Sequence, residues 1–82
     1  MSKREKLIKK FLAIPTKKDL TFRELRTLFK SLGYELINAD GSRVAFCNKK
    51  TGDTFDMHQP HPNDILKVYV VKKVQSKLKE IV

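Results

Sequence analysis

The chain has 82 residues and carries 18 lysines and arginines against nine aspartates and glutamates, a formal net charge of +9. A chain of this length forms one domain, and its charge attracts polyanions such as nucleic acid, an acidic protein or an anionic membrane surface. No apolar run reaches the roughly 20 residues of a membrane span, and no signal-peptide pattern is present. The single cysteine, Cys47, excludes a disulfide framework and a cysteine-rich metal site. We therefore expect a cytoplasmic protein that does not enter a membrane.

The first predicted elements are two helices. In residues 3–13, apolar side chains recur on one face among many lysines, and Pro15 ends the segment. A second helix begins near Thr21, where Glu24 three residues later completes a capping-box pattern, and it ends at Gly33. Its apolar residues repeat at helical spacing: Phe22, Leu25, Leu28, Phe29 and Leu32.

Three strands are predicted next, over residues 34–38, 43–47 and 54–58. The dipeptide at 40–41 is a turn signal, and residues 48–53 form a loop. If the last two strands form an antiparallel hairpin, one face meets the helices. That face carries Val44, Phe46, Phe55 and Met57, and the outer face carries Arg43, Ala45, Cys47, Thr54, Asp56 and His58. The simplest register pairs Cys47 with Thr54, Phe46 with Phe55 and Arg43 with His58.

The chain closes with an extended linker over residues 59–64, which contains two prolines, and a helix over residues 67–81. The helix has an apolar stripe formed by Val71, Val74, Leu78 and Ile81, and a polar side formed by Lys67, Lys72, Lys73, Lys77 and Lys79. The predicted fold class is α+β, a three-stranded antiparallel sheet with helices packed on one face. Double-stranded-RNA-binding domains share this α-β-β-β-α plan, here preceded by an extra N-terminal helix.

An ordered set of segments runs along the stretch from residue 21 onward: Leu32-Gly33-Tyr34, Gly41-Ser42, Lys49-Lys50-Thr51-Gly52, Met57-His58-Gln59-Pro60-His61-Pro62 and the closing helix. In these segments the chain resembles the HicA family, the toxin half of bacterial HicAB toxin–antitoxin pairs. The resemblance indicates one HicA-like domain over residues 1–82, with residues 20–82 as the core and residues 1–15 as an additional N-terminal helix.

The resemblance implies a fold of the double-stranded-RNA-binding type, ribosome-independent cleavage of mRNA, and silencing by a HicB-type antitoxin protein. The family's functional signature is Gly-Ser-His, whereas this sequence reads Gly41-Ser42-Arg43. The histidine position holds arginine, so no catalytic histidine is carried over to it.

Metal-independent cleavage of RNA needs a base for the 2′-hydroxyl proton, an acid for the leaving oxygen, and cations to stabilise the phosphorane. Histidine suits the proton transfer. His58, on the outer face of the sheet beside Arg43, is therefore the first catalytic candidate, and Arg43 is a two-pronged donor to phosphate. His61 is the second histidine candidate, although its prolines also favour a plain linker residue. The other RNA-binding candidates are Ser42, Lys49 and Lys50.

These candidate residues also have purely structural interpretations. One alternative for His58 is a plain residue at the end of an exposed strand, hydrogen-bonded to Asp56 or to the linker, and the lysines of the first and last helices are consistent with a solvated face. The spacing of Asp56, Asp64 and the histidines matches no standard zinc or magnesium pattern, so we expect no metal and no cofactor. Three functions remain open: a HicA-like mRNA endoribonuclease, a non-catalytic RNA-binding module, and a protein-interaction domain that meets an acidic partner.

Overall fold

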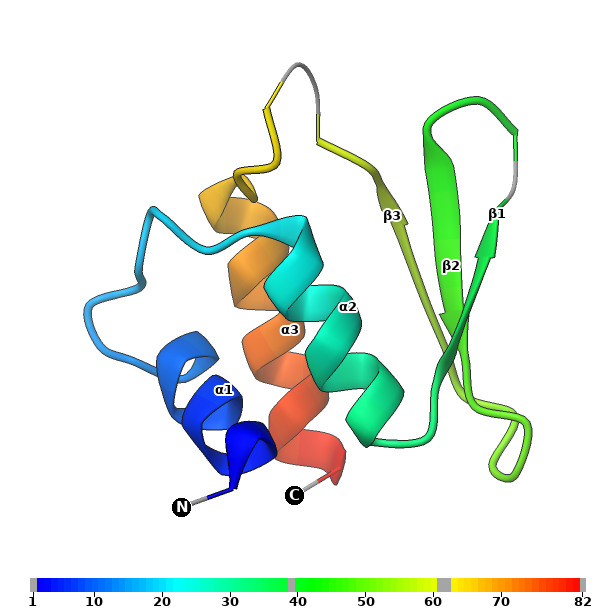
Figure 1. The fold of residues 1–82 in the computed structure, drawn as a ribbon, viewed down its shortest axis with the longest axis horizontal. Coiled ribbons are helices and arrows are strands. Elements are labelled where there is room, and N and C mark those ends of the chain that lie inside the picture. Colours follow the sequence, from blue (N-terminus) through cyan, green and yellow to red (C-terminus); the bar gives the residue numbers. More distant parts are fainter. Residues whose placement is uncertain (1, 39, 61–62, 82) are drawn as a thin grey trace.

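The computed structural model describes residues 2–38, 40–60 and 63–81. Three helices lie on one side of a three-stranded antiparallel sheet with strand order β1-β2-β3 (Figure 1), which confirms the predicted α+β class. In chain order the elements are α1 (Lys3–Phe11), α2 (Phe22–Ser31), β1 (Glu35–Asn38), β2 (Arg43–Cys47), β3 (Thr54–His58) and α3 (Val68–Ile81). The described helices include none that is both long and apolar enough to cross a membrane.

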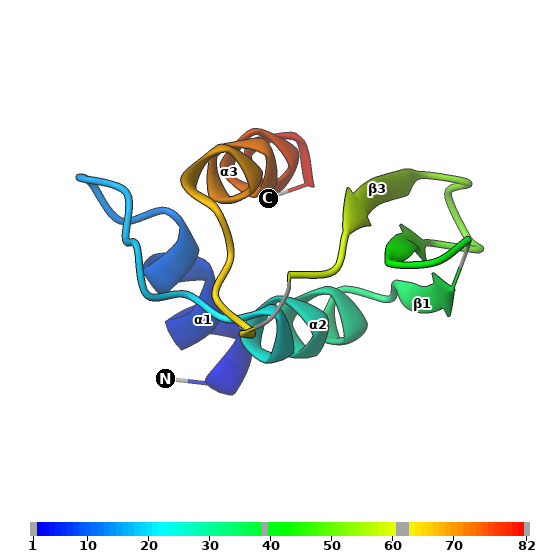
Figure 2. The same ribbon diagram turned by 90° about the horizontal axis from the view of Figure 1, so that it is seen from above.

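The helices form two layers on one side of the sheet. Seen from above, α2 and α3 lie next to the sheet, α2 on the side of β1 and α3 on the side of β3, while α1 packs behind them (Figure 2). Phe11 of α1 is fully buried, and its carbonyl oxygen accepts a hydrogen bond from the Gln75 side chain of α3. The additional N-terminal helix is therefore part of the same core.

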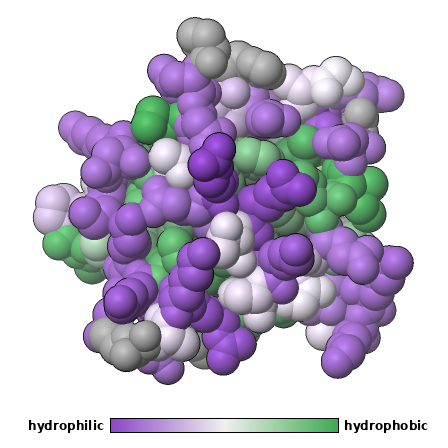
Figure 3. All heavy atoms as spheres, viewed as in Figure 1, coloured by the Kyte–Doolittle hydropathy of each residue, from purple (hydrophilic) through white to green (hydrophobic). Residues whose placement is uncertain are grey.

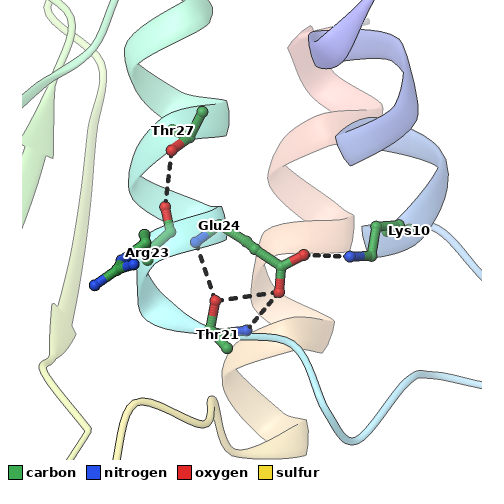
Figure 4. A network of polar contacts seen from close by, with 5 residues as sticks. All are labelled: Lys10, Thr21, Arg23, Glu24 and Thr27. Atoms are coloured by element: carbon green, nitrogen blue, oxygen red, sulfur yellow. Dashed lines mark hydrogen bonds and ion pairs between the residues drawn. The ribbon is translucent and has the colours of Figure 1, made fainter.

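Helix α2 begins with the capping box that the sequence predicts. The Thr21 hydroxyl accepts a hydrogen bond from the Glu24 amide, and the Glu24 carboxylate accepts one from the Thr21 amide (Figure 4). Lys10 of α1 pairs with the same carboxylate. Burial raises the pKa of Glu24, but the hydrogen bonds from Lys10 and Thr21 outweigh it and hold the pKa below its usual value. One carboxylate thus caps α2 and ties it to α1.

The inner face of the hairpin packs on the helices as predicted, because its four apolar side chains are all buried. Phe29 of α2 lies at the centre of this contact, with its ring centroid 4.7 Å from that of Phe46 and 5.2 Å from that of Phe55. The predicted register is also confirmed: Arg43 pairs with His58, Phe46 with Phe55 and Cys47 with Thr54. The alternation of the two strands therefore fixed which side chains face outward.

Helix α3 differs from its predicted pattern at two places. Ile81, expected in the apolar stripe, is 38% exposed, while Val70 completes the buried side instead. Lys77, expected on the polar side, keeps only 17% of its side chain exposed because it reaches the loop between β2 and β3. Its Nζ lies 3.0 Å from Oδ1 of Asp53 in that loop. An ion pair across the fold thus removes one lysine from the solvated surface.

The chain beyond β3 is held against the start of α2. The Phe22 amide donates to the Asp64 carbonyl oxygen over 2.8 Å, and the Leu66 amide donates to the Leu20 carbonyl oxygen over 2.8 Å. The Asp64 carboxylate also accepts a hydrogen bond from the Arg23 amide, at the N-terminus of α2. These contacts fix the far side of the linker that follows His58.

Candidate nucleic-acid interface

Arg43 and His58 lie directly opposite each other where β2 begins and β3 ends. Next to them, the Gln59 amide donates to the Ser42 carbonyl oxygen over 2.7 Å. Hydrogen-bonded and non-hydrogen-bonded pairs alternate along an antiparallel ladder, so Arg43 and His58 form a non-hydrogen-bonded pair. In such a pair the Cα atoms are about 4.5 Å apart and the side chains lie close together. Both residues are exposed, so a guanidinium and an imidazole emerge side by side.

This pair borders a cavity of about 210 Å³ between the sheet and α3. The cavity is lined by Arg43, Asp56, Met57, His58, Tyr69, Val70 and Lys73. Met57 and Val70 are buried, whereas the other five side chains are exposed. A guanidinium, an ammonium group and a carboxyl group therefore line the same space as the imidazole, and we call this space the first cavity.

A second cavity of about 90 Å³ adjoins the first and shares four of its residues, among them His58 and Tyr69. The additional lining comes from Gln59, Pro60, Leu66 and Lys67. His58 and Tyr69 therefore both lie where the two cavities meet. Lys67 adds a further exposed cation at this end of the sheet.

Basic side chains of α2 extend the positive surface past Gln59. A shallow depression of about 390 Å³ is lined by Phe22, Arg23, Arg26, Gln59 and Asp64. Arg23 and Arg26 are exposed, and hydrophilic side chains dominate the face of the molecule that Figure 3 displays. Arginines of α2 thus line a depression that Gln59 borders, while Lys67 and Lys73 line the two cavities that His58 borders.

The remaining predicted RNA-binding residues divide between the two ends of the hairpin. Ser42 is half-buried beside Arg43, and its carbonyl oxygen holds Gln59. Lys49 and Lys50 lie in the loop at the opposite end, one strand of five residues away, which is roughly 13 Å at 3.3 Å per residue. The structure therefore does not bring these two lysines to the Arg43–His58 pair. His61 lies outside the described residues.

The loop end has its own polar network, in which charges are paired. The Asp53 carboxylate accepts hydrogen bonds from the Tyr34 hydroxyl and from Lys77, and these two bonds hold the pKa of Asp53 below its usual value. Burial, together with the bond to Asp53, raises the pKa of Tyr34. The bond to Asp53 also raises the pKa of Lys77 against the opposing effect of burial. Lys49 pairs with Glu35 over 3.3 Å.

The carboxylates near the site were considered above as metal ligands and as a hydrogen-bond partner for the imidazole. Within residues 2–38, 40–60 and 63–81, no group of three or more His, Cys, Asp or Glu side chains is placed to hold a metal ion. Asp64 instead caps α2 through the Arg23 amide. In the same part of the chain, the His58 imidazole makes no hydrogen bond to Asp56, although both line the first cavity.

Tyr69 and Lys73 also line the candidate site, and the sequence analysis did not single them out. They are four residues apart on α3, so they project from the same side of the helix. Tyr69 is 56% exposed. The signal available in the sequence was an aromatic residue just off the apolar stripe, followed one turn later by a lysine.

The arrangement suits recognition of a phosphodiester. A guanidinium donates two parallel hydrogen bonds to phosphate oxygens, and an imidazole next to it can move a proton near neutral pH. Further cations on α2 and α3 would hold the flanking backbone phosphates by counterion release.

Comparison with protein families gives one match over the main part of the chain. The family described as "HicA toxin of bacterial toxin-antitoxin" matches residues 22–81, from the first residue of α2 to the last residue of α3. Searches of curated proteins and of solved structures give no significant match. The match leaves out α1, the element predicted to be an addition to the core.

Proposed function

We propose a function from one premise: this chain belongs to the HicA toxin family of bacterial toxin–antitoxin systems. The protein is an mRNA endoribonuclease that a HicB-type antitoxin neutralises. The observation that carries the proposal is the direct pairing of Arg43 with His58 in the β2–β3 ladder, where both side chains are exposed and line the first cavity. A proton-transfer group and a phosphate-binding group thus face one small space.

In the proposed reaction His58 acts as the base. Its neutral imidazole takes the proton of an RNA 2′-hydroxyl, and the 2′-oxygen attacks the adjacent phosphorus while Arg43 donates hydrogen bonds to the non-bridging oxygens. The bond from phosphorus to the 5′-oxygen breaks, and that oxygen takes a proton from water, which reaches this exposed site. The products are a 2′,3′-cyclic phosphate and a 5′-hydroxyl, and the imidazolium returns its proton to solvent.

Binding of the RNA strand depends on the cations around the pair. Arg23 and Arg26 on α2 and Lys67 and Lys73 near α3 flank the reacting phosphate on either side. Contacts of this kind attract RNA of any sequence and weaken as salt rises. A neutralising antitoxin is expected to present acidic side chains to the same surface, because the net charge of +9 favours an acidic partner.

The test is incubation of the purified protein with end-labelled RNA in a chelating buffer. Wild-type protein should cleave the RNA and leave 2′,3′-cyclic phosphate ends. His58→Ala should slow cleavage by about 10²–10⁴-fold, the usual contribution of one general base. Arg43→Lys keeps the charge but removes the two-pronged donor, so it should also slow cleavage.

Thr54→Ala is the matched control, because Thr54 is an exposed residue at the other end of the same strand. It should cleave RNA at the wild-type rate. Full activity in a folded His58→Ala variant would remove His58 from the mechanism. In cells, induction of the chain should arrest growth, and co-expression of a HicB-like product of the adjacent gene should relieve the arrest.

A second function is favoured by one observation, the arginine in the Gly-Ser-Arg segment at 41–43. A chain with arginine in place of the motif histidine fits a non-catalytic RNA-binding module on the same scaffold. In that case RNA affinity falls steeply with salt while incubated RNA stays intact. The same incubation separates the two functions.

A further inference from the structure

One aromatic side chain next to the Arg43–His58 pair has no structural role in the core. Tyr69 is 56% exposed. Within the part of the chain that the structure describes, its ring packs on no other aromatic ring and its hydroxyl makes no hydrogen bond. The other tyrosine, Tyr34, is 4% exposed and bonded to Asp53. An aromatic ring left open at the edge of a positively charged cavity points to a ligand with its own flat ring.

The position of Tyr69 relates it to the reacting groups. It shares both cavities with His58 and shares the first cavity with Arg43 and Lys73. The first cavity, at about 210 Å³, lies below the roughly 300–1,000 Å³ of pockets that take drug-sized ligands. A space of this size suits a fragment such as one nucleobase. Lys73, one helical turn from Tyr69, places an ammonium group next to that space.

We propose that Tyr69 is a stacking platform for one unpaired RNA base and that Lys73 holds the adjoining phosphate, which makes single-stranded RNA the substrate class. This inference rests on the proposed function, since it places the base beside the bond that His58 and Arg43 act on. Stacking requires an unpaired base, because in an A-form duplex the bases are stacked inside the helix and the protein reads shape and backbone. The platform therefore selects single strands, loops or bulges.

The platform also accounts for how an exposed sheet end holds its substrate. Phosphate contacts position an RNA strand, but they do not hold one particular nucleotide at the reacting groups. A base seated on Tyr69 fixes the nucleotide that enters the first cavity, and it does so with little preference among the four bases because each has a flat face. Lys73 lines the same cavity, so its ammonium group can hold the phosphate that adjoins the seated base.

The experiment measures binding of the full chain to a single-stranded RNA and to a duplex of equal length at one fixed salt concentration. To prevent cleavage, each variant is made in the His58→Ala background. Tyr69→Ala should weaken single-strand binding by about 5- to 100-fold and duplex binding by less than about twofold. Tyr69→Phe keeps the ring and should bind within about twofold of its parent, which separates stacking from the hydroxyl.

Lys73→Gln and Lys72→Gln form a matched pair, because both lysines are exposed on α3 and only Lys73 lines the first cavity. Lys73→Gln should weaken binding several-fold more than Lys72→Gln. Equal losses for single strand and duplex in Tyr69→Ala, or no loss in either, would overturn the platform. A Tyr69→Ala variant that binds RNA normally but no longer binds the antitoxin would overturn it in favour of a protein contact.

Failure of this inference and failure of the proposed function give different results. If the wild-type chain binds no RNA, the proposed function fails and the platform fails with it. If the chain binds RNA and cleaves it but Tyr69→Ala binds single strands normally, only the platform fails. If it binds RNA without cleavage and Tyr69→Ala lowers single-strand binding, the platform stands on the non-catalytic module.

Discussion

The two ends of the β2–β3 hairpin differ in whether their charged side chains are paired. At the loop end, Asp53 is bonded to Tyr34 and Lys77. At the other end, which lies beside the start of α3 in Figure 1, the described side chains of Arg43 and His58 line a cavity and are in no ion pair. Paired charges connect elements and contribute to folding, whereas charges left open at a cavity are available to a ligand. We therefore expect substitutions at the loop end to lower stability and substitutions at the Arg43–His58 end to lower the proposed activity.

The largest effect is expected from a substitution at the Arg43–His58 end of the hairpin, which we call the open end. His58→Ala is expected to lose about 10²–10⁴-fold in cleavage rate while its free energy of unfolding stays within about 0.5 kcal/mol of wild type, because the side chain is exposed. The measurements are RNA cleavage and denaturant unfolding on the same preparation. A large loss of stability in this variant would mean that the open end also supports the fold.

The next largest effect is expected at the loop end, and it should appear in stability and not in the cleavage rate. Tyr34→Phe removes the hydroxyl that donates to the Asp53 carboxylate and should cost about 1–2 kcal/mol. In a domain of this size that lowers Tm by roughly 4–16 °C, with the cleavage rate at low temperature unchanged. Tyr69→Phe loses the same hydroxyl at an exposed position, so it should leave Tm unaltered and serves as the control.

The loop end also predicts how stability depends on pH. The pKa of Asp53 is lowered by its bonds from Tyr34 and Lys77, so its contribution is present above the ordinary value of about 4 and is lost as pH falls below it. The pKa of Tyr34 is raised by burial and by its bond to Asp53, so its contribution is present below about pH 10 and is lost above that value.

Unfolding followed across pH should therefore show a plateau from about pH 5 to pH 9 with a decline on each side. Asp53→Asn should reduce the loss of stability at acid pH, and Tyr34→Phe should reduce the loss at alkaline pH. Acid and alkaline limbs that run parallel to those of wild type in both variants would contradict the assignment of these shifts to the Tyr34–Asp53–Lys77 network.

The smallest effect is expected from the lysines of the loop. Lys50→Gln should lower the slope of log affinity against log salt by about 0.7 if the RNA strand reaches this end, and leave it unchanged if the strand stays at the Arg43 end. Lys49→Gln should alter stability by less than about 1 kcal/mol, since its ion pair with Glu35 is exposed. A salt titration of binding measures the first and thermal unfolding the second.

The sequence predicted most of the fold because its patterns are local. The capping residues Thr21 and Glu24 marked the start of α2, and alternation in the two hairpin strands fixed both the buried face and the pairing of Arg43 with His58. The pairing at the centre of the candidate site therefore followed from the sequence, while the role of the two residues stays a prediction. Register could be predicted because a slip by one residue would turn the buried side chains outward.

Contacts between distant segments were beyond the sequence. Periodicity placed Lys77 among solvated lysines, but the approach of α3 to the loop brings it to Asp53. Periodicity likewise gave no reason to place Tyr69 and His58 at the same cavity, since that depends on how α3 lies relative to β3. Lys49 and Lys50 were grouped with the site by charge alone, and strand length sets them apart from it.

The hydrogen bonds between the start of α2 and residues 64–66 bear on the thermodynamics of RNA binding. His58 is held by the β2–β3 ladder on one side, and the chain that follows is held again at Phe22 and Leu20. A scaffold anchored on both flanks is preorganised, so little backbone entropy needs to be lost when a strand docks. Calorimetry should then report a small heat-capacity change, unlike that of partners that fold as they bind.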